Sequence, residues 1–146
     1  MEIPPLHPEI DDLPEATVTL TPTAGDGDPI EVAVKVAAAP ADRARGLMEV
    51  TDLPPGVGML FLFDGPRTGG FWMWNTVIPL DIAFADAEGV VHTILAMDPC
   101  EASDPNDCPR YTPDEPYVAA LEVAQGWFED NGLAPGAELT WTAPAP

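Results

Sequence analysis

Basic side chains are scarce in this sequence. Five Lys and Arg stand against 25 Asp and Glu, the formal net charge is -20, and the first basic residue is Lys35. Proteins that bind nucleic acid neutralise phosphates with clustered Lys and Arg, and anionic membrane surfaces attract the same side chains. The charge balance therefore excludes nucleic acid and an anionic membrane surface as partners. It predicts a solvated acidic surface that keeps the protein dispersed, and we expect a monomer.

Long apolar runs are also missing. No stretch reaches the ~20 apolar residues that cross a bilayer, so we expect no membrane span. The start of the chain, residues 1–12, has neither the basic region nor the apolar run of a signal peptide. If the protein is exported, its signal sequence is therefore not part of this chain.

The common catalytic and metal-binding motifs are absent from the sequence. It contains no G-x-S-x-G, no H-E-x-x-H, no Walker loop and no dinucleotide-binding glycine pattern, and Ser103 is its only serine. A structural zinc site needs four ligands, whereas the chain offers two Cys and two His. We therefore expect no metal and no cofactor. A catalytic pair of carboxylates cannot be picked out by sequence from 25 acidic residues.

The two cysteines, Cys100 and Cys108, frame a short polar loop. A disulfide between them would suit an oxidising compartment and is the interpretation we favour. Two free thiols, or half of a metal site, are the alternatives. The disulfide predicts an extracytoplasmic protein, either secreted or in the cell envelope.

The apolar content and the turn-forming residues predict a fold that is mainly β. Hydrophobic residues make up 46% of the 146 positions, while 19 Pro and 12 Gly imply many turns and few long helices. This length is typical of one domain. We expect a flexible, acidic, Pro-rich arm over residues 1–15, a single β domain over residues 16–142, and a tail over residues 143–146.

Local patterns predict seven strands and two short helices. Pro40 and Gly132 mark a helix start and a helix end, so we expect helices over residues 41–48 and 125–131. Alternating or β-branched runs predict the strands, with one hairpin joining residues 17–21 to 30–36 and another joining 81–85 to 90–97. The expected strands cover residues 17–21, 30–36, 59–63, 71–77, 81–85, 90–97, 117–123 and 138–142, the run 71–77 continuing after Pro79 into 81–85.

Several blocks of the chain resemble a widespread prokaryotic family, domain of unknown function 192. These blocks are DRARGLM at 42–48, GMLF at 58–61 and FWMWNTVIPLD at 71–81, followed by Pro99, Cys100, Cys108, Pro109, Tyr111 and residues 117–126. The resemblance implies a compact β-sandwich or barrel-like domain with short helices, in proteins that are often exported or lipid-anchored. It implies no activity. Trp74 departs from the basic or polar residue that members usually carry there.

Polar residues inside apolar runs form the main candidate site. Arg45, Asn75, Thr76 and Asp81 interrupt such runs, and a buried polar group costs free energy unless it is paired. They are expected to share one neighbourhood that binds a ligand, with Arg45 holding an anionic group. The structural alternative is an ion pair between Arg45 and Asp81 that braces the helix against the sheet.

Aromatic residues extend this candidate site. Trp72, with Phe71, Trp74 and Trp127, could form a platform on which a sugar ring stacks, although strand alternation would bury about half of these rings in the core. Four Met residues at 48, 59, 73 and 97 are interpreted as core packing rather than as copper ligands.

These observations favour a non-enzymatic, exported β domain. We expect it to bind a small polar or carbohydrate-like ligand, or a protein partner, through Arg45, Trp72, Asn75, Thr76 and Asp81. The alternatives are an enzyme of carbohydrate or envelope metabolism that uses Asp81 as acid or base, and a purely structural interaction module.

Overall fold

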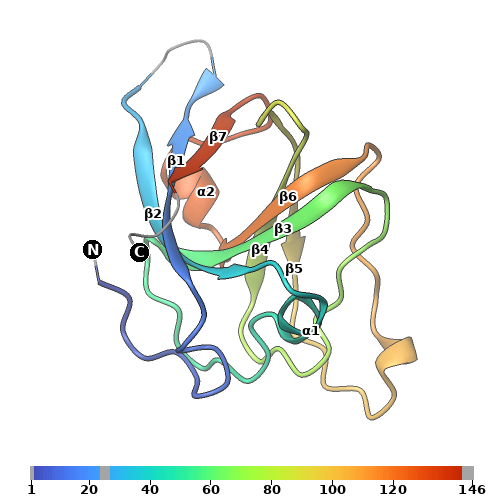
Figure 1. Ribbon diagram of the computed structural model, residues 1–146. Coiled ribbons are helices and arrows are strands. Elements are labelled where there is room, and N and C mark those ends of the chain that lie inside the picture. Colours follow the sequence, from blue (N-terminus) through green and yellow to red (C-terminus); the bar gives the residue numbers. More distant parts are fainter. Residues whose placement is uncertain (1, 24–26, 143–146) are drawn as a thin grey trace.

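A computed structural model describes residues 2–23 and 27–142, and Figure 1 shows their arrangement. The expected tail and part of the first hairpin turn lie outside these residues. Within them the fold is mainly β, as the sequence predicts: seven strands form one curled sheet with two short helices and one 3-10 turn. In chain order the elements are β1 (Glu15–Thr21), β2 (Ile30–Ala37), α1 (Pro40–Arg45), β3 (Val57–Arg67), β4 (Leu80–Ala85), β5 (Val91–Met97), η2 (Pro105–Asp107), β6 (Tyr117–Ala124), α2 (Trp127–Asp130) and β7 (Glu138–Thr142).

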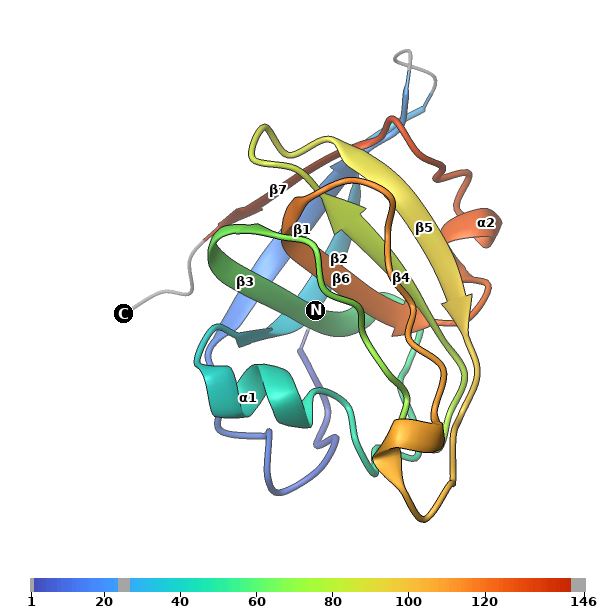
Figure 2. The same cartoon turned by 90° about the vertical axis from the view of Figure 1, so that its right-hand side faces the viewer.

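The sheet curls until its two edge strands meet at one end. Its strand order is β5-β4-β6-β3-β2-β1-β7, and β2 and β3 are the parallel pair, joined by a crossover that contains α1. A bridge between Val90 and Glu138 links the edges, and the Leu139 amide donates to the Gly89 carbonyl at 2.7 Å. The fold is therefore a half-barrel. In Figures 1 and 2, α1 and the loop that contains η2 both lie toward the opposite end, separated from each other.

The two faces of the sheet bury separate apolar clusters because side chains alternate along each strand. The first cluster contains Val18, Val34, Leu60, Leu121 and Leu139, together with Trp127 and Phe128 of α2. The second lies on the other face and contains Met59, Phe61, Ile82, Phe84 and Met97, together with Leu47 after α1. Each strand in the middle of the sheet thus serves both clusters.

Most predicted strands are confirmed within one or two residues at each end. The hairpins pair antiparallel as expected, β1 with β2 and β4 with β5. The predicted core strand 59–63 is the centre of the longer β3. The helices are shorter than predicted: α1 ends where Gly46 turns to a φ of 52°, and α2 covers only residues 127–130.

The prediction of a strand over residues 71–77 is wrong. This segment makes only isolated bridges, Phe71 with Tyr111 and Trp74 with Cys100. Asn75 has a φ of 59°, in the left-handed region, and the Thr76 amide donates to the Met73 carbonyl at 3.0 Å. A left-handed residue and a turn cannot continue an extended strand. The segment still packs against the core through Met73, which is 1% exposed.

The N-terminal segment contacts the sheet through one buried side chain and several hydrogen bonds. Ile10 is 1% exposed within the second cluster, and the Asp11 carboxylate accepts a hydrogen bond from the Leu6 amide at 2.7 Å. Lys35 of β2 donates to the Asp11 carbonyl at 2.8 Å and to the Glu15 carboxylate at 2.6 Å. Among the described residues, no helix is long and apolar enough to cross a membrane.

Candidate functional site

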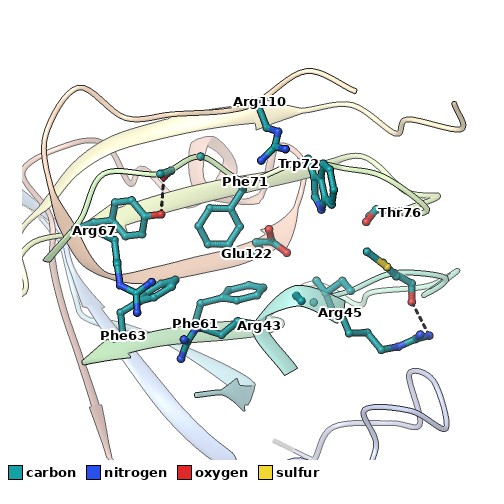
Figure 3. A pocket seen from close by; sticks show the side chains of 17 residues that line it. Arg43, Arg45, Phe61, Phe63, Arg67, Phe71, Trp72, Thr76, Arg110 and Glu122 are labelled. Carbon is teal, nitrogen blue, oxygen red and sulfur yellow. Dashed lines mark hydrogen bonds between the residues drawn. The ribbon is translucent and has the colours of Figure 1, made fainter. Parts of the chain in front are cut away.

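A cavity of about 290 Å³ opens on the face of the sheet that α1 covers (Figure 3). Its walls come from α1 and the turn after it, from β3, and from the segment that precedes Thr76. Apolar surface is supplied by Leu47, Met48, Phe61, Phe63, Phe71 and Trp72. The size suits a small molecule, and an apolar wall with a few polar groups is typical of ligand sites.

Four of the five basic residues of the chain line this cavity. Arg43 and Arg45 come from α1, Arg67 from the end of β3, and Arg110 from the loop that follows Cys108. These positions are far apart in the sequence, so the fold alone brings them together. In a chain with a net charge of -20, the cavity concentrates nearly all of the positive charge.

Aromatic rings hold three of the guanidinium groups in place. The guanidinium carbon of Arg43 lies 4.8 Å from the centre of the Phe63 ring, and that of Arg67 lies 5.1 Å from the same ring. The Arg110 guanidinium carbon lies 4.4 Å from the Trp72 ring centre. A cation over an aromatic face is attracted by the ring quadrupole, which orients these side chains without neutralising them.

Among the described residues, one of these four arginines forms an ion pair with an acidic side chain and the other three do not. Arg45 pairs with Glu49 at 3.1 Å, whereas the other ion pair of the described residues joins Lys35 to Glu15. Arg43 donates to the backbone carbonyls of Ala38 and Leu62. In the described part of the chain, Arg43, Arg67 and Arg110 therefore have no acidic partner. With 25 acidic residues available in the sequence, this arrangement favours an external anion.

Arg45 differs from the other three arginines in its orientation. Its guanidinium turns toward the Met48 carbonyl oxygen, which accepts a hydrogen bond at 3.4 Å (Figure 3), and it also lies 3.3 Å from the ring Nδ1 of His7. Its buried Nε has no hydrogen-bond partner among the described residues. Arg45 thus fastens α1 to the N-terminal segment as well as bordering the cavity.

Among the residues that the structure describes, Glu122 is the only acidic one that lines the cavity. It lies in the middle of β6, paired with Met59 of β3 on one side and with Ile82 of β4 on the other. The residue is 4% exposed, and burial raises the pKa of its carboxyl group to about 8. Glu122 is therefore mostly uncharged at neutral pH and does not cancel the charge of the arginines.

Close backbone packing brings β6 and β3 together beside Glu122. A Cβ atom on Gly58 would lie 2.3 Å from the Glu122 carbonyl oxygen, so only glycine fits there. Tyr117, at the start of β6, donates its hydroxyl hydrogen bond to the Gly69 carbonyl at 2.7 Å, and burial raises the pKa of this phenol. These contacts fix the wall that carries Arg67.

The disulfide predicted between Cys100 and Cys108 is present. It closes the loop that contains η2 and ends two residues before Arg110. The Trp74 indole nitrogen donates to the Ala102 carbonyl at 3.1 Å, which binds this loop to the segment carrying Trp72. The loop is thus attached at two points next to the cavity.

The cavity brings together three of the five residues that the sequence suggested for ligand binding. Arg45, Trp72 and Thr76 line it, and Thr76 is 5% exposed. Asn75 and Asp81 are not among the lining residues. Asn75 is exposed, and its backbone amide donates to the Cys100 carbonyl at 3.2 Å.

Asp81 belongs to the opposite face of the sheet. It precedes Ile82, whose side chain shares the face of Glu122, so alternation directs Asp81 the other way. Its carboxylate accepts a hydrogen bond from the Gly126 amide at 2.9 Å, and burial raises its pKa. The hypothesis of an ion pair between Arg45 and Asp81 is wrong, because Arg45 pairs with Glu49 instead.

Sequence reasoning missed Arg43, Arg67, Arg110 and Glu122. The scarcity of basic residues was a usable signal, because with five Lys and Arg in the chain each arginine could be examined as a candidate anion-binding residue. A Glu inside the apolar run of residues 117–124 was a second signal. Neither pattern indicates that these residues line the same cavity.

The fold and the cavity define a compact β domain with an arginine-lined pocket. The chain belongs to the DUF192 family (Uncharacterized ACR), whose profile it matches over residues 21–141. No protein with a curated function matches it.

Two solved structures are similar to this chain over most of its length. A protein of unknown function from Novosphingobium aromaticivorans DSM 12444 is 34% identical, with a TM-score of 0.77, and the match covers 96% of this chain and 94% of that one. A putative transcription regulator from Sinorhizobium meliloti 1021 is 32% identical, with a TM-score of 0.76, and the match covers 87% of this chain and 93% of that one.

Proposed function

We propose that this protein is a binding domain for a small organic oxyanion, a carboxylate or a phosphate, held in the arginine-lined cavity. The observation that carries the proposal is the gathering of four of the five basic residues around one cavity, three of them without a described acidic partner. Guanidinium groups recognise carboxylates and phosphates through paired hydrogen bonds. The apolar wall suits the rest of the ligand.

The net charge of -20 is compatible with the binding of an anion. At physiological ionic strength, charges separated by more than ~8 Å are largely screened. An anion in the cavity touches the guanidinium groups directly, whereas most acidic side chains of the chain lie outside the lining. Short-range attraction therefore outweighs the repulsion from the rest of the surface.

A neutral sugar fits this cavity less well than an anionic ring compound. The aromatic wall could take the apolar face of a sugar ring, as the sequence suggested. A neutral ligand would, however, leave the arginines without a counter-charge. A sugar that carries an acid group satisfies both features and keeps the carbohydrate-like ligand within the proposal.

The Sinorhizobium meliloti relative is named a putative transcription regulator, but the charges of this chain do not favour DNA binding. Binding a phosphate backbone requires basic residues spread along a surface. Here the arginines surround a cavity, and the rest of the chain has Lys35 as its single basic residue.

Binding also explains the cavity better than hydrolysis by two carboxylates. That chemistry needs two carboxyl groups about 5 to 9 Å apart, whereas Glu122 supplies the one side-chain carboxyl group in the described lining. An oxidising, extracytoplasmic compartment is part of the proposal, and the disulfide between Cys100 and Cys108 supports it.

Calorimetric titration with a matched pair of compounds tests the proposal. 4-Ethylbenzoate carries the anion, 4-ethylbenzamide has nearly the same shape without charge, and phenyl phosphate distinguishes a phosphate site from a carboxylate site. We expect at least one anion to bind and the amide to bind at least about tenfold more weakly, because charged hydrogen bonds are the strong ones. Equal binding of the benzoate and the amide, or no binding by either anion, would overturn the proposal.

Substitutions then locate the site. Arg67→Gln and Arg110→Gln should each weaken anion binding by about tenfold, since each removes a charged donor. Ala87→Glu, in the exposed turn between β4 and β5, changes the net charge by the same amount and is the matched control. If the control weakens binding as much as the arginine variants do, the effect is general charge and not a site.

A further inference from the structure

The Glu122 carboxyl group has unused hydrogen-bonding capacity inside the cavity. Its neighbours across the sheet, Met59 and Ile82, are apolar. No hydrogen bond and no ion pair involves its side chain among the described residues, and burial alone accounts for its raised pKa. A buried polar group without a partner costs free energy, and native proteins tolerate few of them.

A molecule bound in the cavity is the hydrogen-bond partner that remains available to the Glu122 carboxyl group. In Figure 3 its carboxyl group lies between the ring of Phe71 and the helix α1, with Arg67 and Arg110 farther toward the edges. The arginines thus surround the carboxyl group without pairing with it. A ligand held by these guanidinium groups would place another part of its body beside Glu122.

The protonation state decides what Glu122 can offer. A carboxylic acid has one O–H donor, whereas a carboxylate only accepts hydrogen bonds. With a pKa of about 8, the group carries its proton at neutral pH. It can then donate to an uncharged oxygen, and a carbonyl is the strongest common acceptor of that kind.

We propose that Glu122 determines specificity by donating a hydrogen bond to a carbonyl oxygen of the bound anion, so the cavity selects oxyanions that also carry an uncharged carbonyl group. This inference rests on the proposed function. It narrows the ligand class to keto, acyl or amide derivatives of small organic acids. Glu122 acts here as a positioning and recognition residue, and no bond is made or broken.

The groups that face Glu122 set the sign of the pH dependence. Arg43 and Arg45 of α1, Arg67 of β3, Arg110 of the loop before β6, and Tyr117 of β6 itself line the same cavity. β4 contributes Ile82, because Asp81 lies on the other face. Ionised Glu122 would place a negative charge beside a ligand anion and would lose its donor. Affinity for the carbonyl-bearing anion should therefore fall as the pH rises through about 8.

Two benzoates that differ in one group test this inference. 4-Acetylbenzoate has a carbonyl opposite its carboxylate, and 4-ethylbenzoate has a methylene group in its place. We expect the wild-type protein to bind the acetyl compound about tenfold more tightly below the pKa of Glu122, and to lose this preference above it. Titration calorimetry at both pH values measures the effect.

Two variants at Glu122 separate recognition from structure. Glu122→Gln keeps an uncharged donor, so it should retain the preference and make it independent of pH. Glu122→Met has a similar size and no donor, so it should bind both compounds equally. Glu138→Gln, at an exposed position in β7, is the control and should behave as the wild type. Circular dichroism verifies that each variant is folded.

The outcomes distinguish this inference from the proposed function. If the protein binds both benzoates with equal affinity, while the arginine variants still weaken binding, the oxyanion site stands and the role of Glu122 is overturned. The same holds if Glu122→Gln keeps the pH profile of the wild type. If neither benzoate nor phenyl phosphate binds, the proposed function itself fails.

Discussion

The guanidinium carbon of Arg110 lies 4.4 Å from the centre of the Trp72 ring, and Arg110 follows the disulfide-bonded Cys108 by two residues. The covalent loop and the aromatic ring together place this arginine at the cavity. The position of Arg110 at the site is therefore linked to this disulfide.

Removal of the disulfide should weaken both the fold and the site. The loss of the short closed loop should lower the free energy of unfolding by about 2 to 3 kcal/mol in a Cys100→Ser, Cys108→Ser variant. Anion affinity should fall because Arg110 becomes free to leave Trp72. Chemical denaturation and calorimetry measure the two effects, and Arg110→Gln in the variant should then cost less than in the wild type. An undiminished cost would show that the loop does not position Arg110.

Glu122 should make the protein less stable as the pH rises. Its pKa is raised by burial from 4.5 to about 8, so between these values the unfolded chain releases a proton that the folded chain keeps. Stability is then lost with rising pH, by at most about 1.4 kcal/mol per pH unit. Glu122→Gln removes this loss, and its stability relative to the wild type should increase across the window. Parallel denaturation curves with no pH-dependent difference would contradict the burial of the carboxyl group.

Phe61 should be one of the most sensitive positions of the core. The side chain is 1% exposed, and its ring meets that of Phe71 edge-on with a centroid distance of 5.1 Å. Phe61→Ala should lower the free energy of unfolding by about 3 to 5 kcal/mol through lost burial and a new cavity. Denaturant titration provides the number. A loss below about 1 kcal/mol would mean that β3 is not central to the core.

Asp81 provides a test of which face carries the site. Because its carboxylate accepts from Gly126 on the face opposite Glu122, Asp81→Asn should leave anion affinity unchanged. An amide oxygen can accept the same hydrogen bond, so we expect stability to change by less than about 1 kcal/mol. Loss of anion binding in this variant would restore the sequence-based hypothesis that Asp81 is a ligand-binding residue.

The sequence predicted the framework of the sheet because its signals are local. Runs of β-branched and apolar residues bounded by Gly and Pro identified the seven strands of the sheet, and Pro40 identified the start of α1. The strand predicted over residues 71–77 is wrong because alternating aromatic residues are typical of a strand. The left-handed φ of Asn75, which interrupts the extended backbone, cannot be deduced from composition. The disulfide was predictable because its two cysteines are the only ones in the chain.

The candidate site was harder to predict because it depends on which residues meet across the sheet. Asp81 and Glu122 are both acids inside apolar runs, and the sequence gives no reason to prefer either. The register between β4 and β6 pairs Ile82 with Glu122. It therefore places the Glu122 carboxyl group on the face with the cavity and the Asp81 carboxyl group on the opposite face. The same applies to the arginines, which come from three separate parts of the chain.

Lys35, the only lysine of the chain, has a side chain that is 4% exposed and bonded to Glu15 and to the Asp11 carbonyl. Amine-directed reagents need an accessible, deprotonated nitrogen, so they should scarcely modify this side chain while the N-terminal segment stays in place. Acylation of Lys35, followed by peptide mass spectrometry, would therefore report how often residues 11–15 separate from β2 under native conditions. The single lysine thus supplies an intrinsic side-chain probe of local opening, and no engineered label is required.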